Sequence, residues 1–218
     1  MTSTFFQNLN QHHLEIINSF KHPFEIQALL DRTPYSPEDR NRTPAEVLQE
    51  GLAHCLDGAI FAAAALRLLG FPPLLVDMFP DPGMDDDHVL AIFKQNNCFG
   101  ALAKSNFSGL RSREPIYRTI RELVISYFDD FFNVDGIKTL RSYTRPLNLQ
   151  QFDPLNWFSN TQAVDAIEQR LLKLHRFPVI SAEMGARLWP VDSLSYQAGM
   201  LGVNPDGLYK PGKKQPNH

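Results

Sequence analysis

Residues 51–73 read GLAHCLDGAIFAAAALRLLGFPP and predict one buried helix with a clear start and a clear end. From Cys55 to Leu69 nearly every position is apolar, which is typical of a helix covered on all sides. The run of alanines indicates that neighbouring backbones approach this helix closely. Gly70 is a natural helix end, and Phe71-Pro72-Pro73 cannot continue a helix.

Upstream of this helix, a shorter helix is predicted from its capping residues. Thr43-Pro44-Ala45-Glu46 combines a capping threonine, a proline at the first helical position and a glutamate three residues after the cap. We expect this short helix to end near Gly51. Apolar residues at helical spacing predict a helical extension within residues 1–42, which ends in a loop around Pro34 and Pro37.

Downstream of the buried helix, three strands are predicted. Residues 74–79 are apolar and lead into a dense turn signal at residues 80–83. Residues 88–94 and 98–104 flank Gln95-Asn96-Asn97, which favours a hairpin turn. These segments predict a small antiparallel sheet next to the helix.

The second half of the chain predicts further helices and one more strand. Residues 115–132 keep a helical period, and residues 161–175 form an amphipathic helical pattern. Residues 139–149 indicate a strand that Pro146 would confine to a sheet edge. Residues 204–218 are rich in proline, glycine and lysine, and we expect them to be frayed. The resulting order of elements favours the α+β class.

Length and composition bound the domain count and exclude several protein classes. With 218 residues, the chain is one domain or one domain with an appendage, and we divide it into residues 1–42, 43–150 and 151–218. A hydrophobic content of 43% argues against disorder. Two cysteines cannot form a disulfide scaffold or a four-thiolate metal site. A net charge of -3 gives no electrostatic footprint for nucleic acid.

Targeting and membrane signals are not apparent in the sequence. The N-terminus lacks the basic start, apolar core and cleavage site of a signal peptide. The apolar stretch at residues 58–69 contains Arg67 and is shorter than the about 20 residues that span a bilayer. We therefore expect a cytoplasmic protein with no membrane partner, whose cysteines are reduced thiols.

Cys55 is the first candidate for chemistry because it begins the buried helix. The positive end of a helix dipole favours a thiolate and lowers the pKa of a cysteine. Its backbone N–H groups can also stabilise an oxyanion. The alternative is an unreactive thiol packed in the core. Cys98, within a predicted strand, is expected to be an ordinary core residue.

His88 is the second candidate, at the start of a predicted strand and directly after Asp85-Asp86-Asp87. A thiol nucleophile needs an imidazole within hydrogen-bond reach. The three aspartates are expected to favour the imidazolium form, which in turn favours the thiolate. The alternative is a histidine that merely ends a solvated acidic loop.

The two candidates occur within a pattern that resembles the transglutaminase-like superfamily of papain-like cysteine enzymes. The pattern is a cysteine at the start of a small-residue helix, then Leu66-Arg67-Leu68-Leu69-Gly70-Phe71-Pro72 leading into a strand. It continues to Val76 and resumes at His88-Val89-Leu90-Ala91-Ile92. The resemblance covers roughly residues 44–106, under a third of the chain.

This resemblance implies a fold and a reaction. The fold would be a nucleophile helix packed on a small antiparallel sheet. Cys55 would attack the carbonyl of a peptide or amide substrate, with His88 as the base that then protonates the leaving amine. In an intracellular protein, hydrolysis is favoured over cross-linking. The reaction requires no metal and no organic cofactor.

The sequence also departs from that pattern at two positions. Leu56 follows the cysteine, where the family often has tryptophan or another large residue. The family's third catalytic residue is an aspartate about fifteen positions after the histidine, and this chain has none there. Asn106 is our candidate for that role, with Ser105 as its neighbour. An amide oxygen can hold the imidazole tautomer, but Asn106 fits equally well as the end of a strand.

Weaker candidates surround this pair. Gln49 lies six residues before Cys55, the offset at which papain-like proteases place an oxyanion donor. Arg111 could contact a substrate carboxylate, and Asp87 could contact the substrate. His54 is a poor base for the adjacent cysteine, since neighbouring helical positions point about 100° apart; we expect it at the surface or in a pocket wall.

Two alternatives to a thiol enzyme stay open. Cys55, His88 and residues 85–87 could hold a metal ion, but they lack a paired ligand spacing such as C-x-x-C. The missing aspartate also favours a degenerate fold that acts as a binding or scaffold protein.

Overall fold

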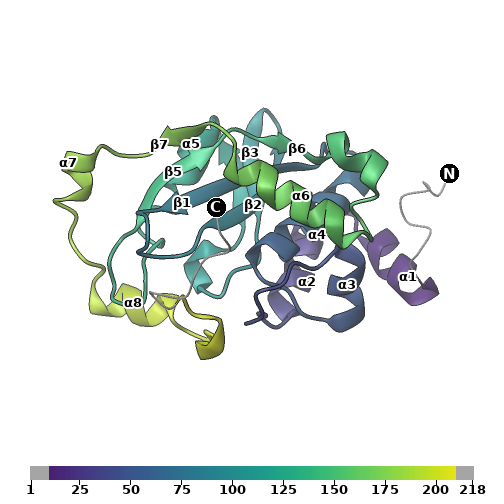
Figure 1. Cartoon of the computed structure of the whole chain (residues 1–218), viewed down its shortest axis with the longest axis horizontal. Coiled ribbons are helices and arrows are strands. Elements are labelled where there is room, and N and C mark those ends of the chain that lie inside the picture. The colour runs from purple at the N-terminus through teal and green to yellow at the C-terminus, as the bar shows by residue number, and fades with distance from the viewer. Residues whose placement is uncertain (1–9, 210–218) are drawn as a thin grey trace.

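The computed structural model describes residues 10–209 as an antiparallel sheet with helices on both faces (Figure 1). The α-helices are α1 (Gln11–Ser19), α2 (Pro23–Arg32), α3 (Pro44–Glu50), α4 (Cys55–Leu68), α5 (Ile120–Ile125), α6 (Thr161–Leu172), α7 (Ala182–Gly185) and α8 (Ser193–Gly199). The 3-10 helices are η2 (Ser108–Leu110), η3 (Leu149–Leu155) and η4 (Pro205–Gly207). None of the helices within residues 10–209 is long and apolar enough to cross a membrane.

The sheet has the strand order β4-β3-β2-β1-β5-β7, with β6 also paired to β1. The strands are β1 (Leu74–Pro80), β2 (His88–Gln95), β3 (Cys98–Leu102), β4 (Arg113–Tyr117), β5 (Leu140–Thr144), β6 (Leu147–Asn148) and β7 (Arg176–Pro178). Every pairing between these strands is antiparallel. The mixture of helices and antiparallel sheet confirms the predicted class at this level.

One face of the sheet packs against α4, which is buried almost throughout. The helix contacts Leu75 of β1 and Val89 and Ala91 of β2 within one hydrophobic core, to which α1, α2 and α6 also contribute. Gly58 allows the closest approach, because a Cβ at this position would lie 2.2 Å from the Cβ of Lys104. A side chain at this position would therefore push α4 away from the chain at Lys104.

The opposite face of the sheet carries a second core. Along the central strands, successive side chains point to opposite faces of the sheet. Every second residue therefore points away from α4. Together with α5 and the chain that follows it, they form a second cluster that includes Val76, Met78, Leu90, Ile92, Ala101, Leu123, Val124, Tyr127 and Phe131. Both faces of β1 and β2 are therefore buried.

The predicted local signals at the helix ends and the hairpin are confirmed. Thr43 accepts a hydrogen bond from the Glu46 backbone N–H, and the Glu46 side chain bonds back to Thr43. Gly51 ends α3 with a φ of 65°, a left-handed conformation that suits glycine. Asn96 and Asn97 both have positive φ values at the β2–β3 hairpin, as a tight primed turn requires.

The helix predicted over residues 115–132 is wrong. Residues 113–117 instead form β4, which pairs with β3, and only α5 is α-helical in this segment. Thr119 caps α5 by accepting from the Glu122 backbone N–H. The apolar period came from α5 and the turns after it, because they place Leu123, Tyr127 and Phe131 in the same core.

Two other predictions for the second half need adjustment. The strand expected at an edge, β5, lies between β1 and β7, and Pro146 falls in the break between β5 and β6. The amphipathic helix is confirmed as α6. Of the segment expected to be frayed, residues 204–209 are bonded to the core, and residues 210–218 lie outside the described residues.

Candidate functional site

Cys55 is the first residue of α4, and its half-buried side chain opens into a cavity of about 220 Å³. The sulfur lies 3.9 Å from the backbone carbonyl oxygen of Asp87. Residues 34–36 pair with Ala53 just before the helix, which places Tyr35 in the cavity wall. The thiol is thus presented to a cavity rather than packed among apolar side chains.

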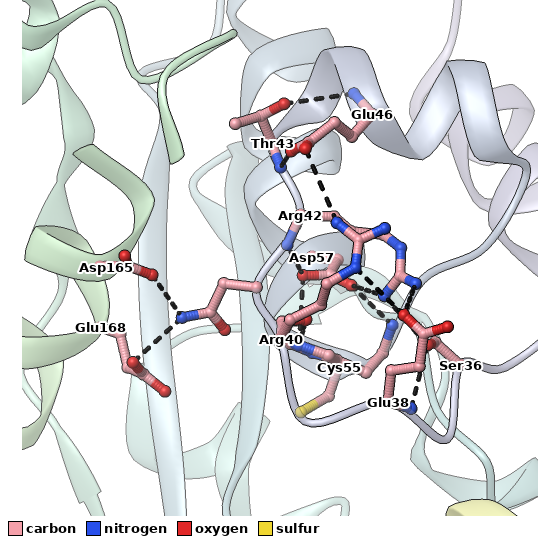
Figure 2. A network of polar contacts seen from close by, with 12 residues as sticks. Ser36, Glu38, Arg40, Arg42, Thr43, Glu46, Cys55, Asp57, Asp165 and Glu168 are labelled. Carbon is pink, nitrogen blue, oxygen red and sulfur yellow. Dashed lines mark hydrogen bonds and ion pairs between the residues drawn. The ribbon is translucent and has the colours of Figure 1, made fainter. Parts of the chain in front are cut away.

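A network of charged groups holds the start of α4 in place (Figure 2). The Asp57 carboxylate accepts hydrogen bonds from the backbone N–H groups of His54, at 3.0 Å, and Arg42, at 2.7 Å. Arg42 is completely buried, and its guanidinium donates to Ser36, Glu38 and Glu50. Figure 2 shows the Cys55 sulfur directed away from this guanidinium. The network fixes the helix end but leaves the thiol to the cavity.

The loop that carries the network also reaches across to α6. The side-chain amide of Asn41 donates to Asp165 and Glu168, each at 3.0 Å. Figure 2 shows these two acids on a separate ribbon from the Arg42 network. Glu168 lines the cavity together with Leu171 and Leu172. One wall of the cavity is therefore α6, and the opposite wall is the start of α4.

His88 does not share this cavity. It begins β2 opposite Met78, so its side chain points to the face that carries Met78 and Leu90, whereas α4 packs on the face that carries Val89. The ring is buried, and Nε2 donates to the Leu110 carbonyl oxygen at 2.8 Å. Within residues 10–209, no hydrogen bond joins Cys55 to His88. The expected thiol–imidazole pair is not formed.

The charge state of His88 also differs from our expectation. Burial lowers the pKa of the imidazole to about 4, with Arg113 contributing and the Leu110 hydrogen bond opposing the change. At neutral pH the ring is therefore uncharged. The preceding aspartates do not hold it as an imidazolium: Asp86 and Asp87 line the cavity on the other side of the strand, and the Asp85 carboxylate accepts from the Thr139 hydroxyl.

Asp87 takes the position beside the thiol that His88 was expected to occupy. Burial raises the pKa of Asp87 to about 7, with a further contribution from Asp86. Burial also raises the pKa of the Cys55 thiol well above its ordinary value, and the carboxylates of Asp87, Asp86 and Asp77 raise it further. The backbone N–H of Val89 works in the opposite direction. The expected thiolate at the helix start is wrong, since burial and negative charge outweigh the helix dipole.

Asp77 is a site residue that the sequence did not single out. It lies on β1 opposite Val89, on the α4 side of the sheet, and lines the cavity with 1% of its surface exposed. Its backbone N–H donates to the Thr144 hydroxyl, while its side-chain Oδ1 has no hydrogen-bond partner. Burial raises the pKa of this carboxyl well above its usual range. The signal was a single acid within the apolar run LLVDMFP.

Asn106 does not orient His88. Its amide donates to the Asn204 carbonyl oxygen at 2.9 Å and accepts from the Asn204 backbone N–H at 2.8 Å. Ser105 accepts from the Phe107 backbone N–H, at a turn. Ser105 is thus engaged in a local turn and Asn106 in a contact with a distant segment, so neither side chain is shown beside His88.

The residues bonded through Asn106 close one side of the cavity. Asn204 also donates to the Tyr35 carbonyl oxygen, and the Tyr209 hydroxyl donates to that of Gly83. Residues 206–209 consequently line the cavity. No sequence pattern pointed to this segment, because the contact joins positions nearly 100 residues apart.

The remaining candidates lie elsewhere. Gln49 is exposed on α3 and is not part of the cavity wall. The Arg111 guanidinium lies 3.7 Å from the Asp31 carboxylate, measured from Nη1 to Oδ1, and is likewise outside the cavity. His54 does lie in the pocket wall, with Nε2 3.2 Å from Asp57. Among the described residues, no group of three or more His, Cys, Asp or Glu side chains is arranged to hold a metal ion.

Comparison with known proteins does not place this chain in a group. No family model matches it, and a search of curated proteins finds no match.

Proposed function

We propose that this protein is a ligand-binding protein with a transglutaminase-like core and that the cavity at Cys55 is its ligand site. The core would consist of α4 and the antiparallel strands β1, β2 and β3. In support, the helix that begins at Cys55 packs directly on β2, in the order that the resemblance over residues 44–106 implies. A pocket that combines apolar walls with a few convergent polar groups is the usual form of a small-molecule site.

The observation that carries this proposal is the placement of Asp87, rather than His88, beside the thiol. A cysteine hydrolase of the implied kind needs a base that both takes and returns a proton. His88 is on the other face of the sheet and bonded to Leu110. The cavity could still bind a ligand, but burial and the neighbouring acids raise the pKa of the Cys55 thiol and so keep it protonated.

The test is the pH dependence of Cys55 alkylation by iodoacetamide, followed by peptide mass spectrometry with Cys98 as an internal reference. We expect Cys55 to react with an apparent pKa above the ordinary thiol range, and His88→Gln to leave this curve unchanged. An apparent pKa well below about 8.5, abolished by His88→Gln, would show an activated thiol–imidazole pair and would contradict the proposal.

A second candidate function is acyl transfer with Asp87, not His88, as the base. It is favoured by one observation: the Asp87 carboxyl, whose pKa is about 7, lines the same cavity as the Cys55 thiol and raises the pKa of that thiol. The carboxylate would take the thiol proton as sulfur attacks an amide carbonyl, and the resulting acid would protonate the leaving amine. Water would then hydrolyse the thioester, releasing the acid and restoring the thiol.

Turnover of a peptide or amide substrate would distinguish the two candidates. Acyl transfer through Asp87 requires that Cys55→Ala and Asp87→Asn both abolish turnover while His88→Gln spares it. A binding protein shows no turnover with any of the three variants or with the natural sequence.

A further inference from the structure

The cavity at Cys55 has an unusual balance of charge. Seven acidic residues line it, among them Asp77 on β1, Asp87 just before β2 and Glu168 on α6. Arg176 lies close enough to lower the pKa of Asp77 and Asp87. Its guanidinium, however, stacks 3.5 Å from the centre of the Phe79 ring and donates to the Leu172 carbonyl oxygen. The described protein therefore supplies the cavity with more negative than positive charge.

Asp77 gives independent evidence that a ligand group belongs in this cavity. A carboxyl oxygen buried without a hydrogen bond is costly, and such atoms are rare in folded proteins. Oδ1 of Asp77 has no partner although the residue is 1% exposed and lines the cavity. A donor brought by a ligand would satisfy this oxygen. Asp77 thus points to a ligand that donates hydrogen bonds, and the other acids of the lining favour one that carries positive charge.

The rest of the lining indicates an organic cation. Leu56, Val89 and Leu171 form apolar parts of the wall around the carboxyl groups. A cavity of about 220 Å³ accommodates a small organic group on these surfaces. The apolar walls would pack against the body of the ligand, while its charged end meets the acids.

The burial of Asp77 favours one type of cation over another. A guanidinium is planar, more weakly hydrated than an ammonium, and donates to a carboxylate through two parallel hydrogen bonds. It consequently costs less to bring into a buried site and makes a more specific contact there. An ammonium group would lose more hydration for fewer directed bonds.

We infer that the cavity binds an organic cation with a guanidinium or amidinium head group, held by Asp77 and Asp87, whose body packs on Leu56, Val89 and Leu171. This inference rests on the proposed ligand-binding function of the same cavity. It adds the chemical class of the ligand.

The titration of the acids gives the site a pH dependence. Burial holds the pKa of Asp87 at about 7 in the cavity without a ligand, so a cation that binds there favours loss of its proton. Binding is therefore expected to tighten as pH rises through 7. The other titratable and charged groups that face this carboxyl from the surrounding elements are Asp77, Asp86, Cys55, Glu168 and Arg176.

The experiment measures how ligands protect Cys55 from a small neutral thiol reagent, methyl methanethiosulfonate. The ligands share one ring and differ in charge: benzamidine, benzylamine, neutral benzamide and benzoate. Cys98 is the reference thiol in the same molecule. With a Kd of about 1 mM, about 10 mM benzamidine would slow labelling of Cys55 about tenfold by mass action. Benzylamine should protect less, and benzamide and benzoate should not protect.

Asp77→Asn and Asp87→Asn should each reduce protection by benzamidine, while Asp129→Asn, at an exposed site, should not. Thermal unfolding of each variant establishes that it is folded, and Asp87→Asn carries the test if Asp77→Asn does not fold. Equal or stronger protection by benzylamine, benzamide or benzoate would overturn the inference. So would a reactive Cys55 that benzamidine does not protect.

These outcomes separate the inference from the function on which it rests. Protection by a neutral or anionic ring would leave the cavity as a ligand site but assign it another ligand class. A Cys55 that still does not react with the small reagent when the pH is raised, while Cys98 does, would overturn the proposed function itself, because the cavity would then be closed.

Discussion

At the scale of single residues, the direction of each side chain along β2 determines the chemistry of the site. Asp87 and Val89 lie on the side of Cys55, and His88 lies on the side of Leu110. A shift of one residue in a strand moves every side chain to the other face. The thiol therefore has an acid as its neighbour, and its pKa is raised rather than lowered.

We predict that Asp87→Asn increases the reactivity of Cys55. The substitution removes the charged group that contributes most, after burial, to the raised thiol pKa. The pKa should fall, so alkylation by iodoacetamide at a fixed pH near 8 should become several-fold faster. Asp129→Asn is the control for a change of net charge at a distant exposed site. An unchanged or slower rate in Asp87→Asn would mean that this carboxylate does not act on the thiol.

The sequence could not show which face His88 occupies. Strand faces are assigned from alternation between polar and apolar residues. In β2 both sets are apolar, because Val89, Ala91 and Phe93 meet one core while Leu90 and Ile92 meet the other. A strand buried on both faces has no alternation, so its phase cannot be read from the pattern. The strand itself was predictable, and its orientation was not.

At the scale of elements, the buried Arg42 network joins the loop before α3, the end of α3 and the start of α4. Arg42 contacts Ser36 and Glu38 in the loop, Glu50 on α3 and Asp57 on α4. Buried charges are stable only when they are paired and hydrogen-bonded. The position of Cys55 thus depends on a residue that does not touch it.

We predict that Arg42→Ala lowers the free energy of unfolding by about 3–5 kcal/mol, since it leaves the carboxylates around Asp57 without their buried partner. Arg40→Ala is a matched control, because Arg40 also pairs with Glu50 but is about half exposed, and we expect a loss of about 1 kcal/mol or less. Urea unfolding measures both. If both variants lost a similar free energy of unfolding, the burial of Arg42 would not explain its contribution to stability.

The sequence predicted well those features of the fold that depend only on residues close together in the chain. The capping box at Thr43, the glycine end of α3 and the asparagine hairpin turn all require only a few adjacent positions. The error over residues 115–132 has a different cause. There β4 forms because its residues pair with β3, and tertiary pairing overrides a local helical period.

At the scale of the whole molecule, the cavity is assembled from distant parts of the chain. Tyr35, Cys55, Asp77, Glu168 and residues 206–209 all line it. The pairing of Asn106 with Asn204 connects the last of these to the sheet. No sequence pattern reports such contacts, so Asp77 and the closing segment could be found only in the structure.

We predict that Asn106→Ala detaches the segment that closes the cavity without unfolding the sheet. The substitution removes two hydrogen bonds to Asn204, which should cost about 1–3 kcal/mol locally. Hydrogen exchange should show faster exchange at the Asn204 and Asp206 amides and little change in β1 and β2. Asn148→Ala, at a 3-10 helix cap elsewhere, should leave these amides unchanged. Unchanged exchange at Asn204 in Asn106→Ala would contradict this role.

The separation of Cys55 from His88 is the central claim, and nitrogen NMR of the His88 ring tests it most directly. Burial lowers the pKa of this imidazole to about 4. We therefore predict a neutral ring with its proton on Nε2 from pH 8 down to about 4, unaffected by Cys55→Ser. A ring that titrates at or above its ordinary value of about 6.5, and whose titration shifts in Cys55→Ser, would contradict this placement and restore the thiol–imidazole pair.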